Sequence, residues 1–118
     1  MLKKIYRLRK KNDFDRVSKE GRTVYAPVFL IKFSKNNLTV SRFGLVVSNK
    51  VSKKATQRNL IRRRISEYIR LNIKSIKSGY DFVIILSPKI INSQGKILDY
   101  QKIGDILRLT LIKAKLIV

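Results

Sequence analysis

The side chains best suited to chemistry in this sequence are the cations between residues 50 and 64. This segment holds four Arg and three Lys and no acidic residue. Arg presents a planar fork that makes paired hydrogen bonds to phosphate oxygens. Without Glu or Asp at helical spacing, the like charges only repel one another until an anion binds. We therefore predict a phosphate-binding segment; the alternative is a solvated helix face.

Side chains that usually perform acid–base or nucleophilic catalysis are missing or scattered. The chain has no His and no Cys, and its seven acidic residues form no recognisable carboxylate motif. The commonest general base, thiol nucleophile and zinc ligands are thus absent. We predict no catalytic residue and no metal-binding residue. Folding can bring distant carboxylates together, so a protein-only nuclease with a metal site remains an alternative.

Length and charge narrow the class of protein further. The 118 residues fit one domain spanning 1–118, and 44% are apolar, which argues against a disordered basic tail. The net charge of +21 calls for a polyanionic partner, because self-repulsion destabilises a compact cationic chain. Nucleic acid, an anionic membrane and an acidic protein are the candidates. No apolar run approaches the roughly 20 residues of a spanning helix, and no secretory signal is visible, so we expect no membrane partner.

Aromatic residues supply a second kind of candidate site. Phe14 either packs in the core or stacks on an unpaired nucleotide at the edge of a cleft. The basic arm formed by residues 1–11 would bring charge to that cleft, unless it is a disordered tail. Four more aromatic residues could form a stacking platform on a sheet, although we expect most of them in the core. They are Tyr25, Phe29, Phe33 and Phe43.

These side chains need helices and strands to position them. A short helix is predicted over 13–20, with Asn12 as its N-cap and Gly21 ending it in the left-handed conformation. Strands are predicted over 28–33, 42–48 and 80–86, the last continuous in apolar character and therefore central. A long helix from Ala55 or Thr56 to about Ile73 has an apolar side next to a basic sector. Asp99 is expected to cap a last helix.

The predicted order is therefore α-β-β-α-β-α in a single two-layer domain that packs helices against a sheet. The strand at 42–48, the long helix and the strand at 80–86 should form a parallel crossover. General statistics would make that crossover right-handed. Lys53 and Lys54 stand just before the first turn of the long helix. Its polar, basic sector comprises Arg58, Asn59, Arg62, Arg63, Ser66 and Arg70.

Three segments, in order and over most of the chain, resemble the protein component of bacterial ribonuclease P. They are residues 7–14 (RLRKKNDF), residues 42–50 (RFGLVVSNK) and residues 58–63 (RNLIRR), with Gly21 between the first two. The signature helix of that family begins Arg-Asn-Arg and continues with a Lys-Arg pair. Here Arg58 and Asn59 match, Arg62 and Arg63 take the places of the pair, and Leu60 departs from the pattern. Ser18 and Ser66 stand where many relatives have Phe and Arg.

The resemblance implies a three-helix, four-stranded α/β fold whose crossover is left-handed, against the general rule. It implies a cytoplasmic subunit of an RNA-based endoribonuclease that removes the 5′ leader of precursor tRNA. The partners would be the catalytic RNA and precursor tRNA, not DNA. The RNA would carry the chemistry with magnesium, and no cofactor would be held by protein side chains.

The resemblance also distributes roles among residues. We expect the catalytic RNA to be bound by Lys50, Lys53, Lys54, Arg58, Asn59, Arg62 and Arg63. We expect the leader-binding cleft to comprise Arg9, Phe14, Val17 and Ser66. A structural RNA-binding protein, such as a ribosomal protein, is the rival from another class. Restored cleavage of precursor tRNA at low magnesium would distinguish the two.

Overall fold

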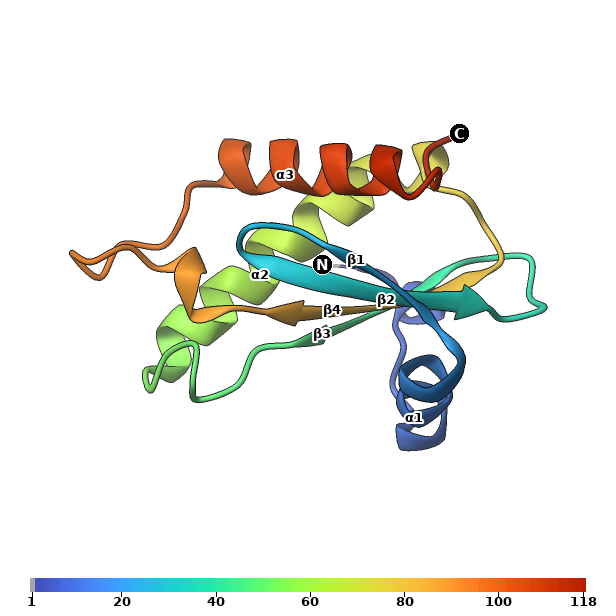
Figure 1. Cartoon of the computed structure of the whole chain (residues 1–118), viewed down its shortest axis with the longest axis horizontal. Helices are drawn as coiled ribbons and strands as arrows, with labels where there is room; N and C mark the ends of the chain where they lie inside the picture. The colour runs from blue at the N-terminus through green and yellow to red at the C-terminus, as the bar shows by residue number, and fades with distance from the viewer. Residues whose placement is uncertain (1) are drawn as a thin grey trace.

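The computed structural model describes residues 2–118, which form three α-helices and one four-stranded sheet (Figure 1). The helices and strands are, in chain order, α1 (Lys11–Glu20), β1 (Arg22–Tyr25), β2 (Phe29–Lys35), β3 (Arg42–Val46), α2 (Ala55–Asn72), β4 (Tyr80–Leu86) and α3 (Tyr100–Lys113). The predicted fold class and order of the long elements are confirmed. Short 3₁₀ turns flank them at Lys4–Tyr6, Ile73–Ser75 and Pro88–Ile90.

The sheet has the strand order β1-β2-β4-β3. β4 lies between β2, with which it pairs antiparallel, and β3, with which it pairs parallel. This confirms the prediction that the most continuously apolar strand is central. β1 was not predicted from the residues, because only Val24 among its four residues is buried. Its pairing with β2 completes the four strands that the family resemblance implies.

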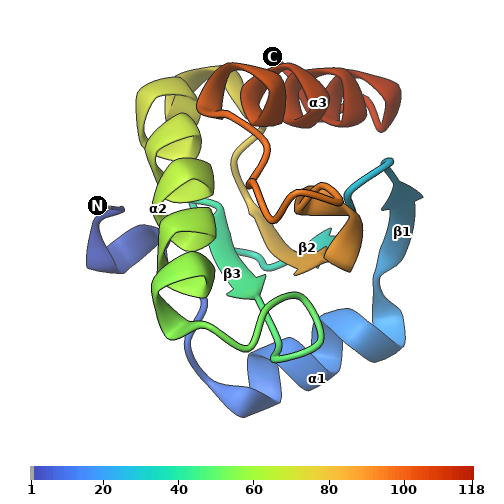
Figure 2. The same ribbon diagram turned by 90° about the vertical axis from the view of Figure 1, so that its left-hand side faces the viewer.

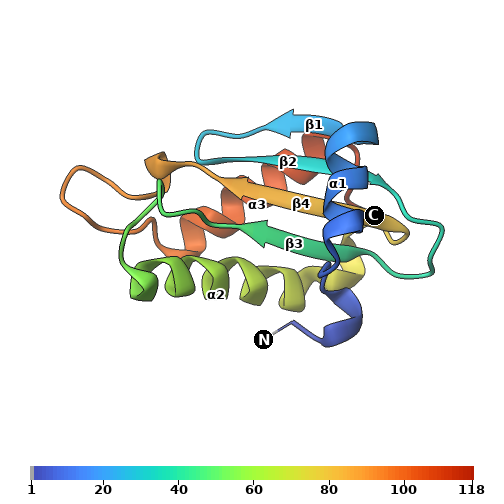
Figure 3. The ribbon, with the colours of Figure 1, turned by 90° about the horizontal axis from the view of Figure 1, so that it is seen from below.

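The crossover from β3 through α2 to β4 is left-handed. Figure 3 views the sheet from the face that carries α1, with β3 and β4 both pointing to the left and β4 above β3. The chain returns through α2 on the side of the sheet away from α1. The right-handed expectation from general statistics is therefore wrong, and the expectation from the family resemblance is confirmed.

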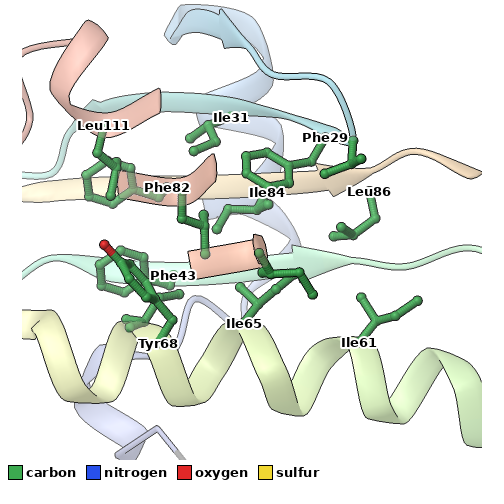
Figure 4. Close-up of a cluster of buried hydrophobic side chains, with 14 of the residues drawn as sticks. Phe29, Ile31, Phe43, Ile61, Ile65, Tyr68, Phe82, Ile84, Leu86 and Leu111 are labelled. Atoms are coloured by element: carbon green, nitrogen blue, oxygen red, sulfur yellow. The ribbon is translucent and has the colours of Figure 1, made fainter. Parts of the chain in front are cut away.

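The main core lies between the sheet and the pair α2 and α3 (Figure 4). Phe82 of β4 is at its centre, and its ring stacks on Phe43 with centroids 4.9 Å apart. The predicted apolar side of α2 enters this core, where Ile61 and Ile65 are fully buried. Phe29 and Phe33 are buried here as well, so a stacking platform that includes these rings is excluded.

α1 packs against the opposite face of the sheet from α3 (Figure 2). It begins at Lys11, two residues earlier than predicted, and its N-cap is Lys10, which makes no side-chain capping bond. Gly21 does not adopt the predicted left-handed conformation, because its φ is −76°. Instead, a Cβ at Gly21 would lie 2.3 Å from the carbonyl oxygen of Val17. Glycine is needed there for close packing rather than for its backbone freedom.

The described part of the N-terminal arm is ordered against the body. Leu2 and Leu8 are buried, and the Leu8 N–H donates to the Phe43 carbonyl at 2.9 Å. Arg7 forms a parallel bridge with Phe43, which extends the sheet edge beyond β3. The alternative of a disordered basic tail is therefore wrong for residues 2–11. No helix in residues 2–118 combines the length and apolar character that crossing a membrane requires.

Candidate nucleic-acid interface

The first turns of α2 present the predicted cations on the side away from the core. Ile61, Ile65 and Ile69 are buried, so the basic sector lies on the other side of the helix. α2 itself runs along the β3 edge of the sheet (Figure 3). Arg63 is exposed, and Arg58 and Arg62 are half-buried. Exposed lysines, which stand just before the helix, are Lys50, Lys53 and Lys54. The structure therefore brings six predicted cations and Asn59 together at one end of α2.

Hydrogen bonds to the chain hold two of the guanidinium groups in place. Arg58 Nη1 donates to the Ser52 carbonyl at 2.9 Å. Arg62 donates to Asn59 Oδ1 at 3.0 Å and to the Val47 carbonyl at 3.3 Å. These contacts orient both groups without neutralising them, because each acceptor is uncharged. The other N–H groups of each guanidinium can then donate hydrogen bonds to phosphate oxygens.

None of the six cations is paired with a carboxylate of residues 2–118. The ion pairs among residues 2–118 join Arg16 and Arg42 to Asp81, Arg42 to Asp13, and Arg70 to Glu67. The basic end of α2 therefore carries uncompensated positive charge. The α2 N-terminus adds to it, since Lys54 is the N-cap and provides no side-chain capping bond.

A pocket of about 320 Å³, here called the Phe14 pocket, lies between the N-terminal arm, β3 and α2. Three of the predicted cleft residues line it, namely Arg9, Phe14 and Ser66, and Arg62 of the basic sector joins them. Val17 does not, because it is fully buried under α1 with Leu8 and Val83. The prediction that Val17 is a cleft residue is therefore wrong, because a fully buried side chain cannot touch a ligand.

Phe14 is a half-buried pocket wall whose ring lies directly over Gly44. A Cβ at Gly44 would come within 2.4 Å of Phe14 Cζ and 2.6 Å of Cε1. Only glycine lets the ring approach β3 this closely. One side of the ring therefore packs on the sheet, as the first reading expects, and the residue also lines a pocket. Stacking of an unpaired nucleotide on Phe14 stays a prediction.

A buried carboxylate, Asp81, ties α1 to the central strand of the sheet. Its side chain is 0% exposed and accepts from Arg42 Nε at 2.9 Å, from Arg42 Nη2 at 2.7 Å and from Asn36 at 2.9 Å. Arg16 of α1 forms a further ion pair with it. Burial alone would raise the pKa of Asp81, but the hydrogen bonds and charges of these partners outweigh burial and lower that pKa.

Sequence reasoning missed this cluster. The available signal was a single acidic residue inside the apolar strand 80–86, which calls for a cationic partner when that strand is central.

Within residues 2–118 no three Asp or Glu side chains come together as a possible set of metal ligands. Asp13 and Asp81, which lie near each other, both face Arg42.

A pocket with a half-buried aromatic ring, beside arginines that pair with no carboxylate in residues 2–118, is the combination expected of an α/β domain that binds nucleic acid. The family model described as Ribonuclease P matches residues 2–107. The chain therefore belongs to the ribonuclease P protein family, and the resemblance seen in its sequence is confirmed.

Individual relatives agree with this assignment. The ribonuclease P protein component of Fusobacterium nucleatum is 43% identical over 82 residues, which are 70% of this chain and 73% of that protein. The Thermotoga maritima component is 40% identical over 84 residues, 71% of each chain. The solved Thermotoga maritima RNase P protein superposes with a TM-score of 0.78 at 34% identity, covering 88% of this chain and 94% of that one. A solved Staphylococcus aureus RNase P protein superposes with a TM-score of 0.81 at 29% identity, covering 96% of this chain and 98% of that one.

Proposed function

We propose that this protein is the subunit of ribonuclease P that binds the catalytic RNA and the 5′ leader of precursor tRNA, and so assists endonucleolytic removal of the leader. The observation that carries the proposal is the unneutralised basic end of α2 directly beside the Phe14 pocket. Arg62 belongs to both surfaces. A single protein surface can therefore contact a structured RNA and an unpaired strand at once.

The basic end of α2 is the surface assigned to the catalytic RNA. Its phosphate ligands are Lys50, Lys53, Lys54, Arg58, Arg62 and Arg63, with Asn59 as a hydrogen-bonding neighbour. Structured RNA offers rows of backbone phosphates, and recognition of such RNA rests mainly on shape and on phosphate contacts. Leu60, where the family pattern has Arg, is half-buried and contributes no charge.

The pocket formed by Arg9, Phe14 and Ser66 is the surface assigned to the leader. An unpaired base stacks on an exposed aromatic face with little dependence on sequence. Mature tRNA lacks the leader, so a contact made here strengthens binding of the precursor and not of the product. The protein thereby raises affinity for substrate while releasing product.

The chemistry is assigned to the RNA, with magnesium, in the cytoplasm. We place no catalytic group and no metal ligand on the protein, and we propose neither DNA nor a membrane as a partner. A phosphodiester hydrolysis carried by metal ions needs clustered oxygen ligands, which RNA phosphates provide.

The decisive experiment is reconstitution of precursor-tRNA cleavage with the catalytic RNA at low magnesium. Added protein should restore cleavage, and Arg58→Ala should weaken holoenzyme assembly about tenfold by removing one charge-assisted contact. Because Arg58 also bonds the Ser52 carbonyl, Arg63→Gln serves as a second variant that disturbs no hydrogen bond given by the structure. Arg108→Gln on the exposed side of α3 is the matched control.

The same assay tests the leader pocket and the rival functions. Phe14→Ala should lower precursor affinity about tenfold and leave the affinity for mature tRNA unchanged. Failure of the wild-type protein to restore cleavage would favour a structural RNA-binding protein. Cleavage by protein freed of all RNA would favour a protein-only nuclease.

A further inference from the structure

A second hollow, distinct from the Phe14 pocket, lies where the N-terminal arm meets α1 and β3. It has a volume of about 450 Å³ and is here called the basic hollow. Its walls are almost wholly charged and comprise Lys4, Arg7, Arg9, Lys10, Asp13 and Arg42. A hollow with this lining fits an anion rather than an apolar ligand.

The cations of the basic hollow are not neutralised by its acidic residue. Asp13 pairs with Arg42 at 3.5 Å, and Arg42 also holds Asp81. The four other cations have no carboxylate partner within residues 2–118. The hollow also borders the N-terminus of α1, where Lys10 is an N-cap without a side-chain bond. The positive end of the helix dipole therefore adds to the field.

These charges are fixed to the body of the protein rather than carried on a mobile tail. The turn Lys4–Tyr6 is followed by the bridge between Arg7 and Phe43. Burial of Leu2 and Leu8 anchors both ends of the segment. Because the backbone of the arm is already ordered, binding an anion costs less conformational entropy than it would on a disordered tail.

The basic hollow adjoins the Phe14 pocket, because Arg7 and Arg9 line both. One compartment thus has an aromatic wall suited to a base, and its neighbour has only charged walls suited to a phosphate. Alternation of base and phosphate is the repeat of a single nucleic-acid strand. The two compartments together match consecutive parts of one strand.

We infer that the basic hollow is a phosphate subsite for the leader strand, holding the backbone phosphate next to the nucleotide that stacks on Phe14. Arg7 and Lys10 are its principal ligands, and Lys4 lines the same hollow. This inference rests on the proposed function. It adds a residue set outside the α2 surface and separates the contacts to the leader from those to the catalytic RNA.

The test is the double variant Arg7→Gln/Lys10→Gln in the reconstituted holoenzyme. Both side chains are exposed and make no hydrogen bond given by the structure, so folding should be preserved. The matched control is Lys102→Gln/Arg108→Gln on α3, which packs on the opposite face of the sheet from α1 (Figure 2). The double variant should bind precursor tRNA about fivefold more weakly, with unchanged affinity for mature tRNA and for the catalytic RNA. The slope of log affinity for precursor against log salt should flatten by about 0.7, the value for one phosphate of a single strand.

A modified leader identifies the phosphate itself. Leaders in which one phosphate at a time is replaced by an uncharged methylphosphonate should show one linkage whose replacement weakens wild-type binding about fivefold but does not weaken the double variant further. Equal losses in both proteins at every linkage would overturn the inference. So would a loss of catalytic-RNA affinity in place of leader affinity. If the wild-type holoenzyme itself binds precursor and mature tRNA equally, the proposed function fails as well.

Discussion

Phe14 can line the pocket only because residue 44 has no side chain. The ring covers the backbone of β3 at a distance that a Cβ would violate. Leu8 packs beside it, so the ring has little room to slide along the sheet. The ring of Phe14 is therefore held in one orientation, which would lower the entropic cost of stacking a base on it.

Gly44→Ala should displace the ring and weaken both folding and leader recognition. We expect an overpacking loss of about 1–3 kcal/mol in the free energy of unfolding, measured by urea denaturation. Precursor affinity in the holoenzyme should fall toward that of Phe14→Ala.

The double variant Phe14→Ala/Gly44→Ala provides the control, because removing the ring makes room for the new methyl group. In that background Gly44→Ala should cost much less stability. An equal cost in both backgrounds would show that contact with Phe14 is not the reason for glycine at this position.

Among the secondary-structure elements, α1 is the one whose placement depends on a buried charge. Arg16 reaches from α1 to Asp81 on the central strand, and Arg42 joins the same carboxylate from β3. Asn36, in the connection between β2 and β3, completes the set. Three separate parts of the chain thus meet at one carboxylate, and this fixes the orientation of the helix that carries Phe14.

Removing the charge of this carboxylate should destabilise the fold. Asp81→Asn leaves Arg16 and Arg42 without their shared anion, and we expect a loss of about 3 kcal/mol in the free energy of unfolding. Glu67→Gln, which breaks the exposed pair with Arg70, is the matched control and should have no measurable effect. Equal stability of the two variants in chemical denaturation would contradict the role given to Asp81.

The same carboxylate predicts a pH dependence. Because the pKa of Asp81 is lowered in the folded state, its ionised form contributes stability at neutral pH. That contribution should begin to fall as the pH drops through the ordinary Asp range near about 4, and should be lost once the pH passes below the lowered folded-state pKa. Denaturation of wild-type protein and Asp81→Asn across this range should give free energies that converge in acid. A constant difference between them would contradict the prediction.

Across the whole molecule, the charge of +21 is distributed over a folded surface rather than a tail. Two of its concentrations, the basic end of α2 and the basic hollow, flank the Phe14 pocket. RNA binding should therefore release many counterions and depend steeply on salt. With roughly six phosphate contacts to the catalytic RNA, the slope of log affinity against log salt should be about −5. Binding titrations over a range of potassium chloride concentrations measure this slope, and a value near zero would contradict the proposed interface.

The sequence by itself determined the need for a polyanionic partner, the order of the long elements and the basic end of α2. Those properties follow from local signals, since apolar periodicity marks each element and a run of unpaired cations needs no tertiary contact to be recognised. Asp99 was correctly assigned as the cap of α3 for the same reason: its carboxylate accepts from Lys102 N at 2.9 Å, three residues away.

Only the tertiary structure decided what depends on contacts between distant segments. β1 is a strand because β2 lies beside it, and Val17 is buried because α1 settles on the sheet. The same holds for the pairing of Asp81 with Arg16, which are 65 residues apart in sequence. The Phe14 pocket and the basic hollow likewise form because the N-terminal arm pairs with β3. No local pattern in the arm encodes that pairing, since its hydrogen-bonding partner, Phe43, belongs to a strand far along the chain.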